Sequence, residues 1–233
     1  MFSRIAVLVV GLALLAGCQG NPSEEPERAF GCPAVEIFGL RGQGQSVQAH
    51  DGMGAEVEQI SEALMDRIDA DMVRMTAIEH ESRLGSWDEY LEDVRDGRER
   101  LRHEIRSVAA MCRDTKIAVI GFSQGSQIAR EELADSKIGR DVDLLVLVGS
   151  PSHDPSSPFH HVELPGDAPT AAGRLGPGPD LGELSERTVE ACVAGDAVCA
   201  KGSSPDDTIH RTAYEERDVV DAIASAAADV LNC

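Results

Sequence analysis

Residues 116–134 read KIAVIGFSQGSQIAREELA. The apolar run 116–121 is typical of a buried strand, and 124–134 follows it directly with helical composition. Between them stands a G-x-S-x-G motif with Ser123 at its centre. In a strand–turn–helix setting this motif is typical of a nucleophile elbow, a sharp turn that lifts a serine hydroxyl clear of the backbone. We therefore predict that Ser123 is a nucleophile and that the Gln124 amide points to where an oxyanion would form.

Apolar runs alternate with helically spaced segments along the rest of the chain. The runs predicted as strands are 34–39, 72–78, 116–121, 142–149 and 188–192. The segments predicted as helices are 53–68, 87–111, 124–134 and 214–231. Strands that alternate with helices favour a parallel sheet covered on both faces. The sequence therefore predicts one α/β domain over residues 32–233, a three-layer α/β/α sandwich around a mostly parallel five-stranded sheet.

Residues 151–186 break this alternation, because they are rich in proline and glycine and have no periodicity. The segment follows the fourth predicted strand, and ligands bind at the carboxyl ends of parallel strands. Long irregular segments in compact domains are often functional covers. Both a cover over the site and a plain surface loop are compatible with this composition.

A serine nucleophile needs a histidine base, and in α/β-hydrolase folds the chain order is Ser, then Asp or Glu, then His. His210 follows the last predicted strand, in a predicted loop before the final helix, and is the candidate base on order alone. The other histidines are His50, His80, His103, His153, His160 and His161.

The candidate for the orienting carboxylate is Asp196. It lies between Cys192 and Cys199, where a disulfide would make the loop rigid, and an orienting group needs rigid support. Asp154 competes with it, because it closely follows a strand end. The remaining acidic candidates are Asp167, Asp206 and Asp207.

The amino-terminal residues are predicted to be a targeting segment. A short basic start precedes an apolar run that is too short to span a bilayer, so 1–17 is interpreted as a signal peptide. The run ends in Leu-Ala-Gly-Cys, which resembles a bacterial lipobox and predicts a lipidated Cys18. Residues 18–31 have the composition of a flexible tether. An ordinary secreted protein with an incidental Cys18 is the alternative.

The chain has six cysteines, which export would place in an oxidising compartment where disulfides form. If Cys18 is lipidated, one of the other five is left over, and Cys233 is the candidate for that role. Neither a CxxC pair nor a histidine ladder is present, so we expect no metal and no cofactor.

The formal net charge is −20 and the aromatic fraction is 3%. The charge repels nucleic acid and anionic headgroups, and the scarcity of aromatic residues argues against a base-stacking surface. We expect a monomer that acts on neutral or hydrophobic small molecules or lipids. Membrane contact is expected only through the lipid anchor.

Four segments, in order, resemble the cutinase family, including its actinobacterial members. They are CPAVEIFGLRG at 32–42, Cys112 with the following run into GFSQG, CVAGDAVC at 192–199, and His210 with Tyr214. The resemblance spans about residues 32–231. The elbow is generic, whereas the Cys-x-x-Gly-Asp-x-x-Cys loop is specific.

The resemblance implies a role for each matched position. Ser123 would be the nucleophile, His210 the general base and acid, and Asp196 the orienting group. The implied disulfides are Cys32–Cys112 and Cys192–Cys199. The implied oxyanion hole consists of the Gln124 amide and residue 43. The family usually has Ser or Thr there, whereas this chain has Gln43, which offers a backbone N–H and a side-chain amide.

The implied activity is hydrolysis of carboxylic esters through an acyl-enzyme. Short- to medium-chain acyl esters or lipids are the expected substrates, because segment 151–186 would restrict bulky polymers. Two alternatives use the same scaffold: an acyltransferase with the same triad, and a catalytically impaired surface lipoprotein with a binding role. The expected location is the cell surface, through Cys18, or the secreted fraction.

Overall fold

A computed structural model describes residues 31–68, 72–203 and 207–232. The predicted signal peptide, Cys18, Asp206 and Cys233 lie outside these residues. The sheet has the strand order β2-β1-β3-β4-β6-β5, and every neighbouring pair is parallel. Its strands are β1 (Val35–Leu40), β2 (Val73–Ala77), β3 (Lys116–Phe122), β4 (Leu144–Val148), β5 (His160–His161) and β6 (Thr188–Ala191).

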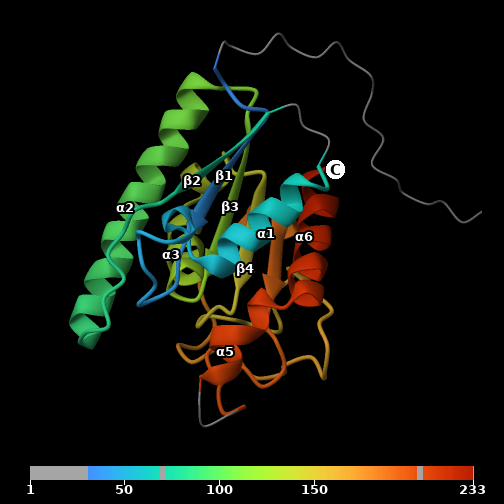
Figure 1. Cartoon of the computed structure of the whole chain (residues 1–233). Coiled ribbons are helices and arrows are strands. Elements are labelled where there is room, and N and C mark those ends of the chain that lie inside the picture. Colours follow the sequence, from blue (N-terminus) through green and yellow to red (C-terminus); the bar gives the residue numbers. More distant parts are fainter. Residues whose placement is uncertain (1–30, 69–71, 204–206, 233) are drawn as a thin grey trace, which may run out of the picture.

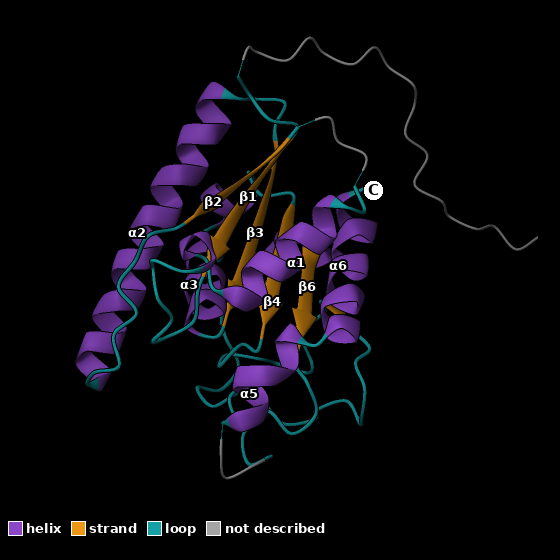
Figure 2. Ribbon diagram, in the orientation of Figure 1, coloured by secondary structure: helices purple, strands orange, loops and turns teal. Residues whose placement is uncertain are grey.

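Helices cover both faces of this sheet (Figure 1). The α-helices are α1 (Ala55–Met65), α2 (Trp87–Met111), α3 (Gln124–Leu133), α4 (Ser136–Gly139), α5 (Thr208–Thr212) and α6 (Arg217–Leu231). The 3₁₀ turns are η1 (His50–Gly52), η2 (Gly182–Arg187) and η3 (Ala213–Glu215). Helices α1 and α6 lie on one face, and α2 and α3 lie on the other (Figure 2). The predicted three-layer α/β/α architecture is confirmed.

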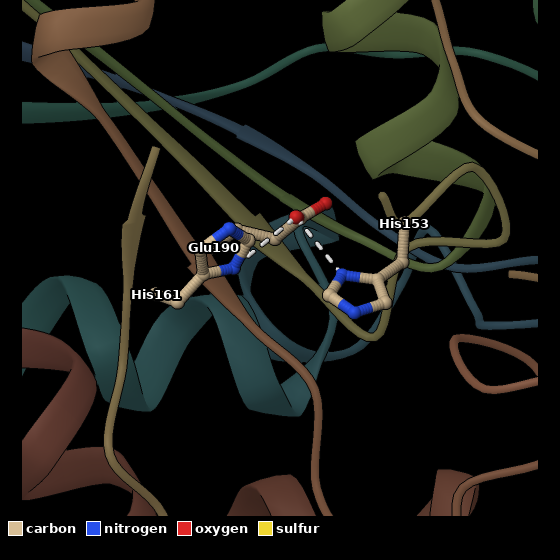
Figure 3. A group of neighbouring side chains, drawn as sticks. All are labelled: His153, His161 and Glu190. Carbon is tan, nitrogen blue, oxygen red and sulfur yellow. Dashed lines mark ion pairs between the residues drawn. The ribbon is translucent and has the colours of Figure 1, made fainter. Parts of the chain in front are cut away.

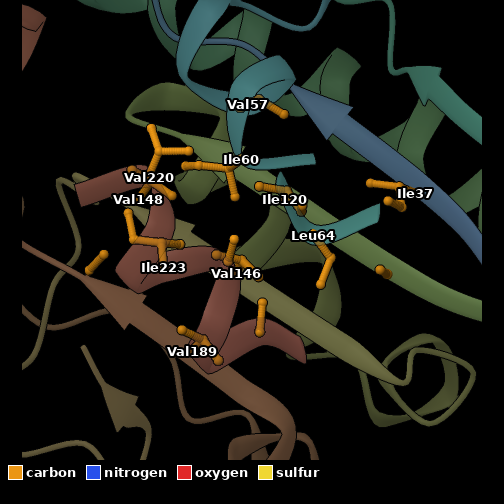
Figure 4. Packing of buried hydrophobic residues seen from close by; sticks show 14 of the residues in the cluster. Ile37, Val57, Ile60, Leu64, Ile120, Val146, Val148, Val189, Val220 and Ile223 are labelled. Atoms are coloured by element: carbon orange, nitrogen blue, oxygen red, sulfur yellow. The ribbon is translucent and has the colours of Figure 1, made fainter. Parts of the chain in front are cut away.

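Two hydrophobic cores, one on each face, hold the layers together. The core under α1 and α6 includes Ile37, Ile60, Ile120, Val146, Val189 and Ile223 (Figure 4). The core under α2 and α3 includes Phe38, Leu101, Ile105, Val119, Leu145 and Leu147. Consecutive strand residues therefore enter opposite cores, and this explains why the strands are continuously apolar rather than alternating.

The sheet has six strands, not the predicted five. The additional strand β5 lies within the proline-rich segment and pairs with β6, His160 opposite Val189 and His161 opposite Glu190. A two-residue, exposed strand carries no hydrophobic periodicity, so the sequence held no signal for it.

Three other predictions also need correction. His210 lies in the short helix α5 rather than in a loop; five residues are too few to show helical periodicity. The predicted helix 53–68 starts only after Gly54, whose φ of +86° is not helical. The predicted helix 214–231 starts at Arg217, because η3 precedes it. Helix α2 has its predicted bounds, and a capping box between Ser86 and Glu89 fixes its start.

One disulfide links distant parts of this framework, and a second closes a short loop. Cys32–Cys112 joins the chain before β1 to the end of α2, at the amino edge of the sheet. Cys192–Cys199 closes a loop directly after β6, at the carboxyl edge. Among the described residues, no helix is both long enough and apolar enough to cross a membrane.

Candidate active site

Ser123 stands at the turn between β3 and α3, with a φ of +53° and a ψ of −115°. A positive φ is costly for a residue with a side chain, so the surroundings must hold it. Glycines on either side permit the turn: a Cβ at Gly121 would lie 2.6 Å from the carbonyl of Gly125, and a Cβ at Gly125 would lie 2.2 Å from the Leu40 carbonyl oxygen. The Ser123 N–H donates to the Val148 carbonyl at 2.9 Å. The predicted sharp turn is present, and it brings the start of α3 close to the sheet.

The structure brings His210 and Asp196 to this serine. His210 Nε2 lies 2.9 Å from Ser123 Oγ, and His210 Nδ1 lies 2.9 Å from Asp196 Oδ2. The His210 ring stacks on Phe122, with centroids 4.8 Å apart. Gly149 permits this position, because a Cβ there would meet the His210 ring at 3.0 Å. With Nδ1–H donating to Asp196, Nε2 is free to accept the serine proton.

Asp196 is fully buried, and donors surround its carboxylate. Oδ1 accepts a hydrogen bond from the Val198 N–H at 2.7 Å, and Oδ2 accepts one from the Tyr214 hydroxyl at 2.7 Å. Burial raises the pKa of the Asp196 carboxyl, but the hydrogen bond and charge of His210, together with the other donors, outweigh it and hold the pKa below its usual value. The group is therefore an anion in the neutral range, as an orienting carboxylate requires.

Tyr214 connects this carboxylate to the backbone. Its hydroxyl donates to Asp196 and accepts from the Val193 N–H at 3.0 Å. Burial and the neighbouring Asp196 charge raise the pKa of Tyr214 well above 10, so the phenol stays a donor. The sequence motif included Tyr214 only by position; this contact was not predicted.

The oxyanion side of the site differs from the prediction in one detail. Gln124 is the first residue of α3, so its backbone N–H has no intrahelical partner. The Gln43 side-chain amide donates one hydrogen bond to the Arg83 carbonyl at 2.8 Å. Among the described residues, no partner contacts the backbone N–H of Gln43, and this residue lines the same cavity as Ser123. The backbone amides of residues 43 and 124 are thus the candidate donors.

A side-chain relay that the sequence did not reveal holds the loop of Gln43. The Gly42 N–H donates to Gln45 Oε1 at 2.6 Å, and Gln45 Nε2 donates to Glu56 Oε2 at 2.6 Å. Glu56 is buried, and burial raises its pKa despite the hydrogen bond from Gln45. In the sequence, the available signal was an acidic residue near the start of the predicted helix 53–68.

A cavity of about 680 Å³ opens over Ser123 and His210. Its walls combine apolar and polar side chains. The apolar ones are Leu84, Trp87, Tyr90, Phe122, Pro151, Leu175 and Val198. Pro151, Arg174 and Leu175 come from the proline-rich segment, which therefore forms part of the wall. Of the two interpretations of segment 151–186, a cover over the site and a plain surface loop, this position favours a part in the site.

Among the described residues, the other acidic candidates make no hydrogen bond to His210. Asp154 bonds to Ser156, and Asp167 lines a different cavity. Asp207 pairs with Arg174 at the rim of the Ser123 cavity. Among the other histidines, His50 pairs with Glu58, while His80 is buried, and burial lowers its pKa to about 4. Within the described part of the chain, one group could hold a metal ion, His153 with His161 and Glu190, and it lines a different cavity from Ser123.

Comparison with known proteins agrees with this fold. The family model described as Cutinase matches residues 31–229. The catalytic core domain of acetyl xylan esterase from Trichoderma reesei superposes with a TM-score of 0.65 at 19% identity, over 85% of this chain and 98% of that one. A cutinase-like protein from Cryptococcus sp. superposes with a TM-score of 0.68 at 16% identity, over 86% and 95%. A Trichoderma reesei cutinase in complex with a C11Y4 phosphonate inhibitor gives 0.59 at 16% identity, over 86% and 77%. No curated protein matches the chain significantly in sequence.

Proposed function

The chain belongs to the cutinase family and is a carboxylic ester hydrolase, and we propose that it cleaves short- to medium-chain acyl esters through an acyl-enzyme on Ser123. The observation that carries this proposal is the continuous hydrogen-bond path from Ser123 Oγ through His210 to Asp196. Such a path is what activation of a serine hydroxyl requires at neutral pH.

In the first half of the reaction, Ser123 Oγ attacks the ester carbonyl carbon while its proton passes to His210 Nε2. The resulting oxyanion lies against the backbone amides of Gln124 and Gln43. Removing a single oxyanion donor typically costs about 10²–10³ in rate, so the second amide matters. The tetrahedral intermediate collapses, His210 gives its proton to the leaving alkoxide, and an alcohol departs.

In the second half, water attacks the acyl-enzyme. His210 takes a proton from the water and then returns one to Ser123 Oγ, so that the acid and the free serine are released. Asp196 holds the imidazole tautomer and stabilises the imidazolium in both halves without taking a proton.

The cavity supports acyl esters of limited length as substrates. Its volume of about 680 Å³ lies within the usual range for small-molecule sites. Several apolar residues of its wall are also exposed to solvent: Leu84, Trp87 and Leu175. An apolar rim favours an acyl chain over a charged substrate.

We further propose that the protein is exported and anchored through a lipid on Cys18. The two disulfides are compatible with an oxidising compartment. Expression of the full chain with a radiolabelled fatty acid should label the wild type and leave Cys18→Ala unlabelled. Equal labelling of both proteins would refute the anchor.

The test of the catalytic proposal is hydrolysis of p-nitrophenyl esters from acetate to palmitate, with Ser123→Ala beside the wild type. We expect kcat/KM to peak at short or medium length and to fall by about 10⁴-fold or more in the variant. Mass spectrometry of the wild type after a brief reaction with an alkyl phosphonate should locate one adduct, on Ser123.

Three outcomes would contradict the proposal. Unchanged turnover in Ser123→Ala would exclude this nucleophile. No turnover by a folded wild type would favour a binding role. A predominant transfer product in the presence of an alcohol acceptor would identify an acyltransferase instead.

A further inference from the structure

Glu190 is a charged residue in the middle of strand β6, and only 1% of it is exposed. Its neighbours Val189 and Ala191 enter the core under α1 and α6, so its own side chain lies on the opposite face of the sheet. Neither carboxylate oxygen has a hydrogen-bond partner among the described residues. The Arg130 guanidinium lies 3.7 Å from Oε1 without a hydrogen bond to it. Because a buried carboxylate is strongly unfavourable unless it is well paired, Oε2 calls for a further positive charge.

Two histidines of the proline-rich segment face this carboxylate (Figure 3). His153 Nδ1 lies 2.9 Å from Glu190 Oε2, and His161 Nδ1 lies 3.7 Å from the same oxygen. Both His153 nitrogens and both Glu190 oxygens are without a hydrogen-bond partner in the described chain. The 2.9 Å contact between them therefore does not have the geometry of a hydrogen bond. Short but poorly directed contacts are expected where ligand atoms converge on a shared third point.

The environment of His161 fixes which of its nitrogens is free. Nε2 lies 3.1 Å from the Ser157 carbonyl oxygen, which can only accept a hydrogen bond, so Nε2 carries the proton. In the neutral ring, Nδ1 therefore presents a lone pair toward Glu190. A backbone carbonyl that orients the distal nitrogen of a histidine in this way is the usual support of a metal-binding imidazole.

We propose that His153, His161 and Glu190 bind a divalent transition-metal ion, with Zn²⁺ as the best fit. Two imidazole nitrogens and one carboxylate oxygen are a zinc ligand set, and imidazole ligands disfavour Mg²⁺ and Ca²⁺. The ligand atoms lie within 4.8 Å of one another. Ligands about 2.0–2.2 Å from a tetrahedral zinc are about 3.4 Å apart. His153 Nδ1 and Glu190 Oε2, which are 2.9 Å apart, must therefore separate slightly, and His161 Nδ1, at 3.7 Å, must approach. His161, on a two-residue edge strand and a third exposed, is the ligand free to move.

One positive charge, that of Arg130, lies beside the site, and two acidic residues line the adjacent cavity. Arg130 approaches the other carboxylate oxygen, Oε1, at 3.7 Å, and its guanidinium is held by the Ser152 and Pro179 carbonyls. This leaves Oε2 for the metal. A cavity of about 550 Å³ opens at the cluster, and the acidic residues Glu163 and Asp167 line it. The cavity offers an entry path and room for a fourth ligand.

The metal would have a structural role. It would tie two points of the proline-rich segment, His153 after β4 and His161 in β5, to strand β6. The same segment carries Pro151, Arg174 and Leu175 to the wall of the Ser123 cavity. The sequence predicted no metal, because it contains neither a CxxC pair nor a histidine ladder, whereas these ligands come together only in the folded chain.

The test is calorimetric titration of the chelator-treated full chain with Zn²⁺, compared among wild type, His161→Gln and His160→Gln. His160 is the matched control: it is the adjacent, exposed histidine, and its ring bonds to the Glu186 carbonyl instead. We expect one Zn²⁺ per chain in the wild type and in His160→Gln, and an affinity at least tenfold lower in His161→Gln. The thermal midpoint should rise with Zn²⁺ in the wild type and in His160→Gln, and it should not rise in His161→Gln.

Cobalt provides a second readout, because tetrahedral Co²⁺ with nitrogen and oxygen ligands absorbs visible light. The wild type and His160→Gln should show this band, and His161→Gln should not. All three proteins carry the same cysteines, so zinc bound to Cys18 or Cys233 would not distinguish them. No stoichiometric Zn²⁺ binding by the wild type, or equal binding by His161→Gln, would overturn the proposal.

Discussion

The Asp196 carboxylate depends on Tyr214 as well as on His210. Replacing Tyr214 by Phe removes one donor to Asp196 and leaves the buried Val193 N–H without an acceptor. We expect Tyr214→Phe to lower the free energy of unfolding by about 1–3 kcal/mol. We expect kcat to fall about tenfold, far less than the roughly 10⁴-fold expected for Asp196→Asn, which favours the wrong imidazole tautomer.

Urea unfolding and p-nitrophenyl butyrate kinetics would check both effects of Tyr214→Phe. Stability equal to that of the wild type would show that the hydroxyl does not support the Val193 amide. A loss of activity as large as that of Asp196→Asn would show that Asp196 cannot orient His210 without it.

The ionisation of one residue, Glu56, makes the stability of the folded protein depend on pH. Because its folded-state pKa is raised, the folded protein binds a proton more tightly than the unfolded chain does. Stability therefore falls as pH rises from the ordinary glutamate value through the folded pKa, and the penalty is constant above it. Glu56→Gln, which still offers Gln45 an acceptor, should be more stable than the wild type at pH 7 and equally stable at low pH.

Melting temperatures of the two proteins between pH 3.5 and 8 would test this, with Glu62→Gln, an exposed position of the same helix, as the control. A constant difference across the range would mean that Glu56 ionisation is not its cause.

At the scale of elements, the two disulfides should contribute differently to stability and to catalysis. In the chain-entropy model, Cys32–Cys112, with a separation of 80, contributes about 4.5 kcal/mol, and Cys192–Cys199, with a separation of 7, about 2.5 kcal/mol. The first lies at the amino edge of the sheet, away from Ser123. The second closes the loop whose backbone N–H groups hold Asp196.

Paired Cys→Ser variants would therefore separate the two roles. Replacing Cys32 and Cys112 should cost more stability and preserve kcat. Replacing Cys192 and Cys199 should cost less stability and lower kcat by tenfold or more. Denaturant unfolding and kinetics below the unfolding transition would measure both. Equal effects on kcat would show that Asp196 is held without its disulfide.

For the whole molecule, the formal net charge of −20 predicts self-repulsion in the folded state. Salt screens this repulsion, but it also weakens surface ion pairs such as Arg67–Asp221. Exposed pairs contribute little each, so the net repulsion should dominate. We expect the melting temperature to rise as NaCl increases from about 10 to 300 mM. The rise should be about 2–4 °C for each kcal/mol of folding free energy that the screening restores. A falling melting temperature would show that the ion pairs dominate.

The sequence by itself determined the features that depend on neighbouring residues. Continuous apolar runs predicted the strands that are buried on both faces, and the spacing of apolar residues predicted α2 to the residue. The glycines around Ser123 predicted the turn, because only glycine permits such close approach to Leu40 and Gly125. Short elements such as β5 and α5 were missed, because a few residues show no periodicity.

Only the tertiary structure decided what depends on residues far apart in the chain. Asp154 and Asp196 were both candidates, and packing of α5 against the Cys192–Cys199 loop brought Asp196, not Asp154, to His210. The direction of the Gln43 side chain depends on the Arg83 carbonyl, 40 residues away. The meeting of His153, His161 and Glu190 depends on the pairing of β5 with β6. Local pattern carries no information on such contacts, because they form only when the layers pack together.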